Sequence, residues 1–335
     1  MKNKTVNKSK TAAFMIGAIV LLLVATLLNI CIGASNLDLE GLWKALLSGP
    51  DTSAAARILW YVRLPRTAAC LLAGAALAVS GAVIQKVLAN NLASPGIIGI
   101  NAGAGLAVAV CCAFGWFTSW AIAGFSFIGA VCATFLVVIT AQKSGASKTT
   151  VVLGGVAVTA FLNAITEGII TMIPDAALAS ADFRAGGFSA VNSGRLIPAS
   201  IIIPVVIIVI WSLANEMDVL SLGDDTAHSL GMNTATVRNL LLALAAVLAG
   251  AAVSFAGVLG FVGLIVPHMV KRFIGTESRS VIPACALSGA GFVALCDLAA
   301  RMLFAPYELP AGILMSALGG PFFIWLLWNS KGNRV

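Results

Sequence analysis

Long apolar runs, separated by short polar stretches, follow one another along the whole chain. A helix needs about 20 mostly apolar residues to cross the hydrocarbon core of a bilayer. Runs bounded by charge, proline or glycine predict ten such helices, at about 11–32, 64–85, 95–114, 119–141, 150–172, 196–215, 238–256, 257–273, 280–303 and 308–328. We therefore expect an all-α membrane protein with about ten transmembrane helices, in which residues 1–335 form one transmembrane domain.

The composition excludes a soluble protein. Of the 335 residues, 60% are hydrophobic and 10% are charged, whereas soluble domains are about half apolar and a quarter charged. Too few polar side chains are present to cover the surface of a soluble enzyme or binding module. The net charge of +7 suits nucleic acid or anionic lipid, and in a membrane protein we expect loops that face membrane lipid and no nucleic acid.

The positions of lysine and arginine predict the orientation, because cytoplasmic loops carry the excess of both. With the N-terminus inside, 13 of the 20 fall on the cytoplasmic side and seven outside. We expect both termini in the cytoplasm, with residues 1–10 as a basic tail that anchors this topology. Arg63, Arg66 and Arg301 lie at external helix ends, against the rule. An anionic partner is therefore expected for Arg63 and Arg66, either lipid headgroups or an acidic protein.

The two halves of the sequence resemble each other weakly. An arginine, a Gly-Ala-Ala triplet and a proline occur in the same order twice: Arg66, 74–76 and Pro95, then Arg238, 250–252 and Pro267. The interval from arginine to proline is 29 residues in both cases. Because the predicted helix 64–85 runs inward and 238–256 runs outward, we expect two inverted-repeat-like halves, which is a common plan of transporters.

Sequence motifs of catalysis are missing. The chain has no GxxxxGK[ST] loop for nucleotide phosphates, no HExxH and no GxSxG elbow. His228 and His268 are its two histidines, and the seven cysteines form no CxxC pair. We interpret the cysteines as small buried hydrophobes and His268 as an interface residue. We therefore expect no enzyme activity, no cofactor and no metal site.

Two carboxylates lie within the predicted spans, where a buried acid is costly and is a functional candidate. Asp297 and Arg301 are four residues apart on one helix, so a local ion pair is the simpler interpretation. Glu167 either lines a pathway or caps the outer end of its helix. The glycines at 257, 260 and 263 are expected to form one flat helix face for close packing.

Two connecting segments are candidates for moving parts. Asn90, Asn91 and Pro95 interrupt the helix pattern, and unwound backbone at membrane depth is tolerated only beside protein or water. The segment is thus either a gate or an ordinary inner turn. The loop 216–237 contains a predicted short helix, 224–230, stopped by Gly231. It either projects to bind a partner ATPase or lies on the surface as a connector.

Taken together, six motifs resemble the permease subunits of type II ABC importers for iron–siderophore, haem and cobalamin uptake, the FecCD-type family. They follow in the family's order over about residues 60–328: Arg63-Leu64-Pro65-Arg66; Gly81, Gln85, Asn90, Leu92-Ala93 and Pro95-Gly96; Gly223, Ala227 and Leu230-Gly231; Phe261-Val262-Gly263-Leu264 and Pro267-His268; Asp297 and Arg301; Glu308-Leu309-Pro310 and Gly312. One departure is Asn90-Asn91-Leu92, where the family usually has Asn-Pro-Leu.

The resemblance implies a dimer with the transport pathway between two permease subunits, of the same or a related chain. It further implies two cytoplasmic ABC ATPase subunits, an external substrate-binding protein and a metal chelate as cargo, most simply a ferric siderophore, in a bacterial inner membrane. It assigns three groups of residues. Docking of the binding protein maps to Arg63, Arg66 and Arg301. Coupling to the ATPases maps to Gly223, Asp224, Ala227, His228, Leu230 and Gly231. The pathway and cytoplasmic gate map to Gln85, Asn90, Asn91, Leu92, Ser147, Lys148 and Thr149.

Two other classes compete with this interpretation. A self-sufficient secondary transporter needs sites for a coupling ion near the middle of the membrane, and the scarcity of acids within the spans argues against it. An intramembrane enzyme needs a nucleophile or a metal motif, which the sequence lacks. Within the importer family, cobalamin and haem remain alternatives to a ferric siderophore.

Overall fold

The computed structural model describes residues 8–33, 39–143, 148–191 and 193–330. Every regular element in these ranges is a helix, which confirms the all-α expectation. The elements are α1 Lys8–Cys31, α2 Leu39–Ser48, α3 Ala54–Ile58, the π-helix η1 Leu59–Arg63, α4 Leu64–Val87, α5 Ile100–Ala113, α6 Ser119–Lys143, α7 Lys148–Met172, α8 Pro174–Ala185, α9 Ser193–Ser212, α10 Ala214–Leu220, α11 Asp224–Ser229, α12 Thr234–Ala256, α13 Val262–Ile274, α14 Ser278–Met302 and α15 Ala311–Ser330.

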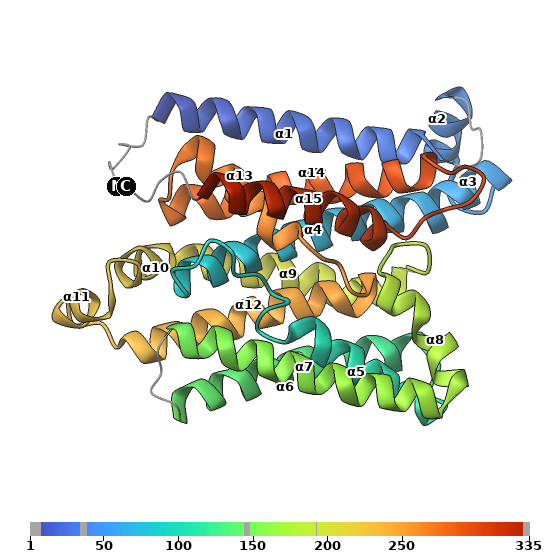
Figure 1. The fold of residues 1–335 in the computed structure, drawn as a ribbon. Coiled ribbons are helices and arrows are strands. Elements are labelled where there is room, and N and C mark those ends of the chain that lie inside the picture. The colour runs from blue at the N-terminus through green and yellow to red at the C-terminus, as the bar shows by residue number, and fades with distance from the viewer. Residues whose placement is uncertain (1–7, 34–38, 144–147, 192, 331–335) are drawn as a thin grey trace.

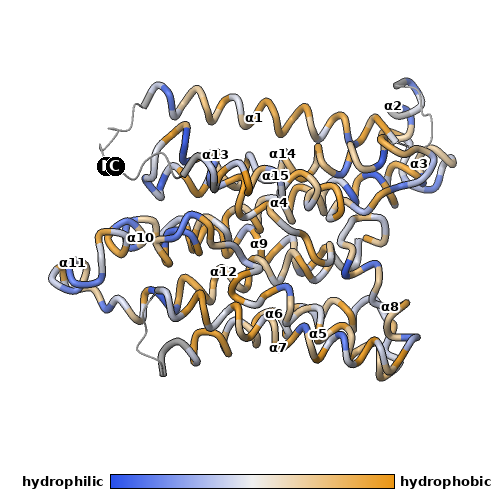
Figure 2. Tube along the Cα trace, viewed as in Figure 1, coloured by the Kyte–Doolittle hydropathy of each residue, from blue (hydrophilic) through white to orange (hydrophobic). Residues whose placement is uncertain are grey.

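Each of the ten predicted apolar runs contains a helix, and the long helices lie roughly along one axis (Figure 1). One end of the bundle carries α10 and the protruding α11, and we call it the α11 end. The opposite end carries α2, α3 and α8, and we call it the α8 end. Hydrophilic residues gather mostly at these two ends, and apolar residues fill the length between them (Figure 2). This distribution suits a bundle that crosses a bilayer along that axis.

The helices differ in length. Within the described residues, six are long and apolar enough to cross a membrane, and α9 with α10, bent by 55°, makes a seventh if the two are counted as one span. At a rise of about 1.5 Å per residue, α5 and α13 are each only about 20 Å long. Both follow a non-helical segment, 88–99 before α5 and 257–261 before α13. Each of these two predicted spans is therefore a half-helix preceded by a non-helical segment.

Helix α4 lies at the centre, packed against α12, α13 and α14. Its packing surface consists of small residues, which let backbones approach closely. A side chain at Gly74 would overlap the backbone of Gly289, and one at Gly81 would overlap Gly263. Most residues of α4 are buried, whereas only a minority of the residues of α1, α6 and α7 are.

The inverted-repeat expectation fits the arrangement of helices. Helices α4 and α12 are 24 and 23 residues long, and each is followed by a break and a short helix of 14 or 13 residues. The two long helices pack against each other and run in opposite directions (Figure 1). The same plan of long helix, break and half-helix thus occurs twice with opposite sense.

The structure corrects two details of the predicted helices. Gly257 ends α12 with a φ of 69°, Gly260 lies in the break and Gly263 lies in α13, so these glycines do not form one helix face. The helix that contains Pro65 does not begin there, since helical backbone continues from Ala54 to Val87 through the π-turn η1. Proline has no backbone N–H to donate in a helix. The wider π-turn just before Pro65 accommodates the helical hydrogen bond that is therefore missing.

Candidate functional site

A cluster of charged side chains occupies the α8 end of α4 and α14. We call Arg63, Arg66, Asp297, Arg301 and Glu308 the arginine cluster. Arg66 donates from Nε to Asp297 Oδ2 at 3.0 Å and from Nη2 to Oδ1 at 2.9 Å. Its Nη1 donates to Glu308 Oε2 at 2.7 Å. Two carboxylates, 231 and 242 residues away from Arg66 in the sequence, therefore share its guanidinium group.

The other two arginines of the cluster hold the end of α1. Arg301 donates from Nη2 to Asn29 Oδ1 at 2.6 Å. Its Nε lies 3.2 Å from Asp297 Oδ2, an ion pair that lacks the geometry of a hydrogen bond. Arg63 donates from Nη1 to the carbonyls of Ile30 and Cys31, at 2.7 and 2.8 Å. Cations at these carbonyls complement the negative end of the helix dipole of α1.

All three arginines are buried, with exposed fractions of 3% for Arg63, 8% for Arg66 and 7% for Arg301. Buried charges persist where they are paired or hydrogen-bonded: Arg66 and Arg301 face carboxylates, and Arg63 is hydrogen-bonded to carbonyls. The expected pair of Asp297 with Arg301 is present, but Asp297 makes its hydrogen bonds to Arg66. These arginines are therefore engaged within the chain, and the side chain of Glu308, 35% exposed, separates Arg66 from the outside.

Glu167, expected to line a pathway or to cap its helix, lies within α7, five residues before its end. Its carboxylate is 3.6 Å from Arg184 Nη1 of α8. Both side chains are partly exposed, 68% and 37%, so this ion pair contributes little to stability. It places a pair of opposite charges at the α8 end, where α8 lies against α5 and α7.

The predicted gate segment begins at the α11 end of α4. Asn90 Oδ1 accepts a hydrogen bond from the N–H of Leu92 at 2.9 Å, which fixes a local turn. Gln85 is buried and donates to the Gly263 carbonyl at 3.2 Å, while its Oε1 accepts from Lys271 Nζ at 2.9 Å. Gln85 thus joins α4 to α13.

Three further residues of the predicted gate fall, in the sequence, at the junction of α6 and α7. Ser147 falls outside the described residues. Lys148 is the first residue of α7, and Thr149 follows it with an exposed side chain. Asn91 is exposed and Leu92 is half-buried.

The predicted coupling loop contains a short helix as expected, α11, which ends at Ser229 just before Gly231 with a φ of 84°. It protrudes from the bundle (Figure 1). Asp224 pairs with Arg238 of α12 at 2.7 Å, and Ala227 is fully buried. Leu230 and His228 are exposed. The loop is therefore held at its base and presents apolar and polar side chains outward.

A further ion pair, which the sequence did not reveal, joins this loop to the gate segment. Asp218 of α10 lies 2.8 Å from Lys86 Nζ, in the last turn of α4. The same carboxylate accepts a hydrogen bond from Ser278 Oγ of α14 at 2.7 Å. Lys86 also donates to the Thr276 carbonyl at 2.8 Å. Residues 86 and 218 are far apart in sequence, and both types are common in polar loops, so no local signal could pair them.

These features define a multi-pass membrane permease: a helical bundle with paired half-helices, a protruding loop at one end and a charged cluster at the other. Comparison with known proteins gives the family. Residues 21–329 match the model of the FecCD transport family, and the chain belongs to this family of inner-membrane importer permeases.

Curated relatives agree with this assignment. The chain is 36% identical over 317 residues to the iron(3+)-hydroxamate import system permease protein FhuB of Bacillus subtilis (strain 168), covering 93% of this chain and 82% of that one. It is 34% identical to the hemin transport system permease protein HmuU of Yersinia pestis, covering 96% and 97%. It is 36% identical to the vitamin B12 import system permease protein BtuC of Shigella boydii serotype 18 (strain CDC 3083-94 / BS512), covering 93% and 94%.

A solved structure has the same fold. It is an inward-facing conformation of a metal-chelate type ABC transporter, with a TM-score of 0.83 and 26% sequence identity, covering 95% of this chain and 99% of that chain. The predicted fold class, an all-α permease of the type II importer kind, is confirmed.

Proposed function

We propose that this chain is the permease subunit of a binding-protein-dependent ABC importer that moves a ferric siderophore into the cytoplasm. Membership of the FecCD transport family carries the importer role. The proposal of a siderophore is supported by the hydroxamate permease among the relatives. The chain itself supplies the pathway, and a partner chain hydrolyses ATP. Haem and cobalamin are the alternative cargoes, since relatives of similar identity are named for each.

The α11 loop is the proposed contact with one of two cytoplasmic ATPase subunits. The proposal includes a cytoplasmic location for the α11 end and for both termini. The exposed Leu230 and His228 of the loop offer a small surface outside the bilayer. Displacement of α10 and α11 acts on α4 through the pair of Asp218 and Lys86, 2.8 Å apart. Lys86 lies four residues before the segment 90–92, so this ion pair supports a mechanical link from the ATPase contact to the proposed gate.

The α8 end is the proposed docking surface of an external substrate-binding protein. Arg63, Arg66 and Arg301 bring three positive charges to this end against two carboxylates of the cluster. Because Glu308 lies between Arg66 and the outside, an acidic residue of the binding protein reaches Arg66 by replacing Glu308. Arg63 and Arg301 act mainly by holding the end of α1 in place beneath this surface.

The exposed apolar faces of α7 and α15 support a second permease subunit as partner, with the pathway between the two. Large side chains exposed on these helices are Leu153, Val156, Phe161, Ile313, Leu318 and Ile324. Lipid covers the remaining apolar surface.

The test is purification of the chain from native membranes in mild detergent, with mass spectrometry of the proteins that accompany it. We expect a P-loop ATPase and a binding protein, and a second permease if the dimer is heteromeric. The complex is then placed in proteoliposomes and offered a ⁵⁵Fe-labelled hydroxamate chelate, hemin or vitamin B12, with and without ATP. If the complex takes up hemin or vitamin B12 and not the hydroxamate chelate, that compound is the cargo and the siderophore is not. Uptake that follows an ion gradient and ignores ATP would refute the importer role.

A further inference from the structure

The short helix α2, which lies outside the predicted spans, is packed onto the end of α1 at the α8 end of the bundle (Figure 1). Ala45 of α2 is 1% exposed and packs with Leu59 of η1. Ile30 and Cys31, in the last turn of α1, pack against the same cluster. The indole Nε1 of Trp60 donates to the Ala45 carbonyl at 3.2 Å. One side of α2 is therefore fixed to the end of α1 and to the helix that leads into α4.

This packing places α2 at the edge of the bilayer. Helix α1 has 24 residues, which is about 36 Å of helix, and the hydrocarbon core is about 30 Å thick. Large apolar side chains are exposed along α1, such as Leu23 at 57% and Leu27 at 61%, as expected of a helix in contact with lipid. Helix α1 therefore spans the whole core. Its last turn, with α2 against it, falls at the boundary between membrane and water.

The exposed surface of α2 has an apolar edge and a polar edge. Trp43 is 64% exposed, Leu46 43% and Leu47 71%. Glu40 and Lys44 form an exposed ion pair toward the other edge. With 3.6 residues per turn, Leu46 and Lys44 lie about 160° apart around the helix axis. An amphipathic helix of this kind lies in the plane of the interface, with its apolar edge toward the acyl chains.

The helix next to α2 exposes side chains in the order that a bilayer favours. From the α8 end inward, α3 and η1 expose Arg57, then Trp60 at 37% and Tyr61 at 54%, and then Val62 at 53%. Trp and Tyr are enriched at the boundary between membrane and water, and cations near a helix end reach toward the headgroups. Through Trp60, which is bonded to α2, the apolar edge adjoins a surface typical of contact with lipid.

We propose that α2 is an interfacial anchor, with Trp43, Leu46 and Leu47 in the headgroup region of the leaflet at the α8 end, against phospholipid. An external protein in this place would leave three large apolar side chains in water whenever it dissociates, whereas lipid covers them permanently. Arg63 donates to the carbonyls at the end of α1, on which α2 packs. The anchor therefore also holds the arginine cluster at a fixed depth. This inference is independent of the cargo.

The first test compares the two edges of α2 by cysteine labelling. The variants are Leu46→Cys and, as the matched control, Ser48→Cys, because both side chains are exposed and lie about 160° apart around α2. The full chain is placed in nanodiscs of phosphatidylethanolamine and phosphatidylglycerol and treated with a membrane-impermeant maleimide. Each rate is corrected for the parent chain and divided by the rate of the same variant in sodium dodecyl sulfate.

We expect the thiol at position 46 to react about tenfold more slowly than the thiol at position 48, because a group held among the headgroups meets little of a water-soluble reagent. Neither substitution alters Ala45, which carries the packing of α2, so both variants should keep the fold. Equal rates at the two positions would place both edges in water and overturn the proposal.

A second measurement identifies what covers the apolar edge. Benzoylphenylalanine in place of Trp43 should crosslink to phospholipid under light, in the complex purified from native membranes and returned to the same nanodiscs. The same group in place of Leu230, which is 65% exposed at the end of α11, should not. Crosslinks from position 43 to protein alone, or none at all, overturn the anchor. Failure of ATP-driven uptake by the same complex refutes the importer role instead, which keeps the two failures distinguishable.

Discussion

Replacement of Asp297 by Asn should destabilise the bundle strongly. Asp297 is 1% exposed, and its two oxygens face Arg66 at 2.9 and 3.0 Å and Arg301 at 3.2 Å. Removal of one partner of a buried ion pair costs about 3–5 kcal/mol, because the remaining charge is buried without compensation. Arg66 retains Glu308, and Arg301 retains Asn29. We therefore expect a loss at the lower end, about 3 kcal/mol.

The free energy of unfolding is measured by denaturant titration in mixed micelles, with helix content as the signal. The control is Glu40→Gln, because Glu40 pairs with Lys44 at 2.6 Å with both side chains about three-quarters exposed. A solvent-exposed pair of this kind contributes little, so the control should unfold like the parent protein. The contrast isolates burial as the cause, since both substitutions neutralise one carboxylate of an ion pair.

A double-mutant cycle tests the reasoning further. In the variant Asp297→Asn with Arg301→Gln, one buried positive charge is removed together with the negative one. The loss should be smaller than the sum of the two single losses, because contacting residues are not additive. A loss below about 1 kcal/mol for Asp297→Asn, or strict additivity in the cycle, would refute the account of the cluster as a compensated set of buried charges.

Three further predictions concern other parts of the molecule. Asp218→Asn should leave ATPase subunits bound but lower uptake per ATP hydrolysed, because the link of α10 to Lys86 is weakened; equal coupling ratios in reconstituted vesicles would exclude this link. Glu308→Gln should tighten binding of the external protein several-fold in surface plasmon resonance, because Arg66 loses its internal competitor; weaker binding would mean that Glu308 itself contacts the partner. Gly81→Ala should prevent close packing of α4 on α13 and lower the unfolding temperature, whereas Gly124→Ala, with no atom near, should not.

The sequence alone determined the class of protein and the location of its helices. Apolar runs of about 20 residues are a local property, and a helix in contact with lipid bonds its backbone polar groups within the same segment. Gly231 likewise ended α11 as predicted, because a helix stop depends on the φ of one residue. Local signals also revealed the interruption near Pro95, although not that α5 and α13 are only half-helices.

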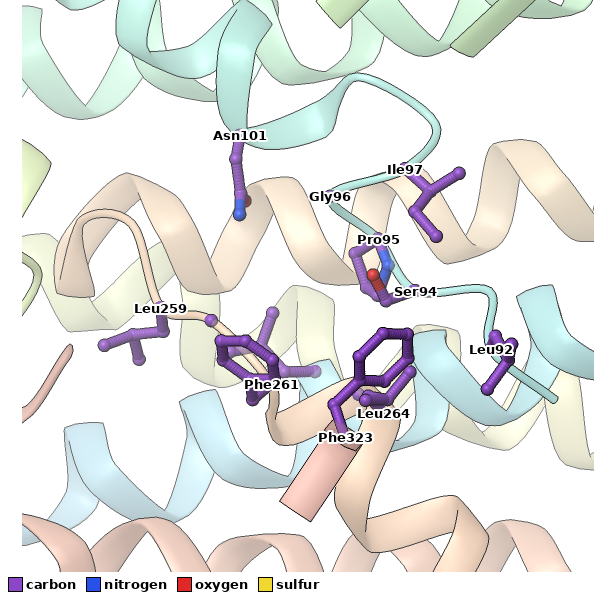
Figure 3. Close-up of a pocket in the computed structure, with 13 residues that line it drawn as sticks. Leu92, Ser94, Pro95, Gly96, Ile97, Asn101, Leu259, Phe261, Leu264 and Phe323 are labelled. Carbon is purple, nitrogen blue, oxygen red and sulfur yellow. The ribbon is translucent and has the colours of Figure 1, made fainter. Parts of the chain in front are cut away.

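Only the tertiary structure decided what the charges do. Arg66 and Asp297 are 231 residues apart, so no spacing in the sequence could show that the arginines predicted to face a partner are paired inside the bundle. The cavity lined by Leu77, Asn101, Leu264 and Phe323 is formed by α4, α5, α13 and α15 together (Figure 3), and it exists only once these helices are packed. Burial and pairing depend on which distant segments meet, whereas helix formation depends on neighbours in the chain. For this reason the sequence predicted the spans, and the structure identified the contacts between them.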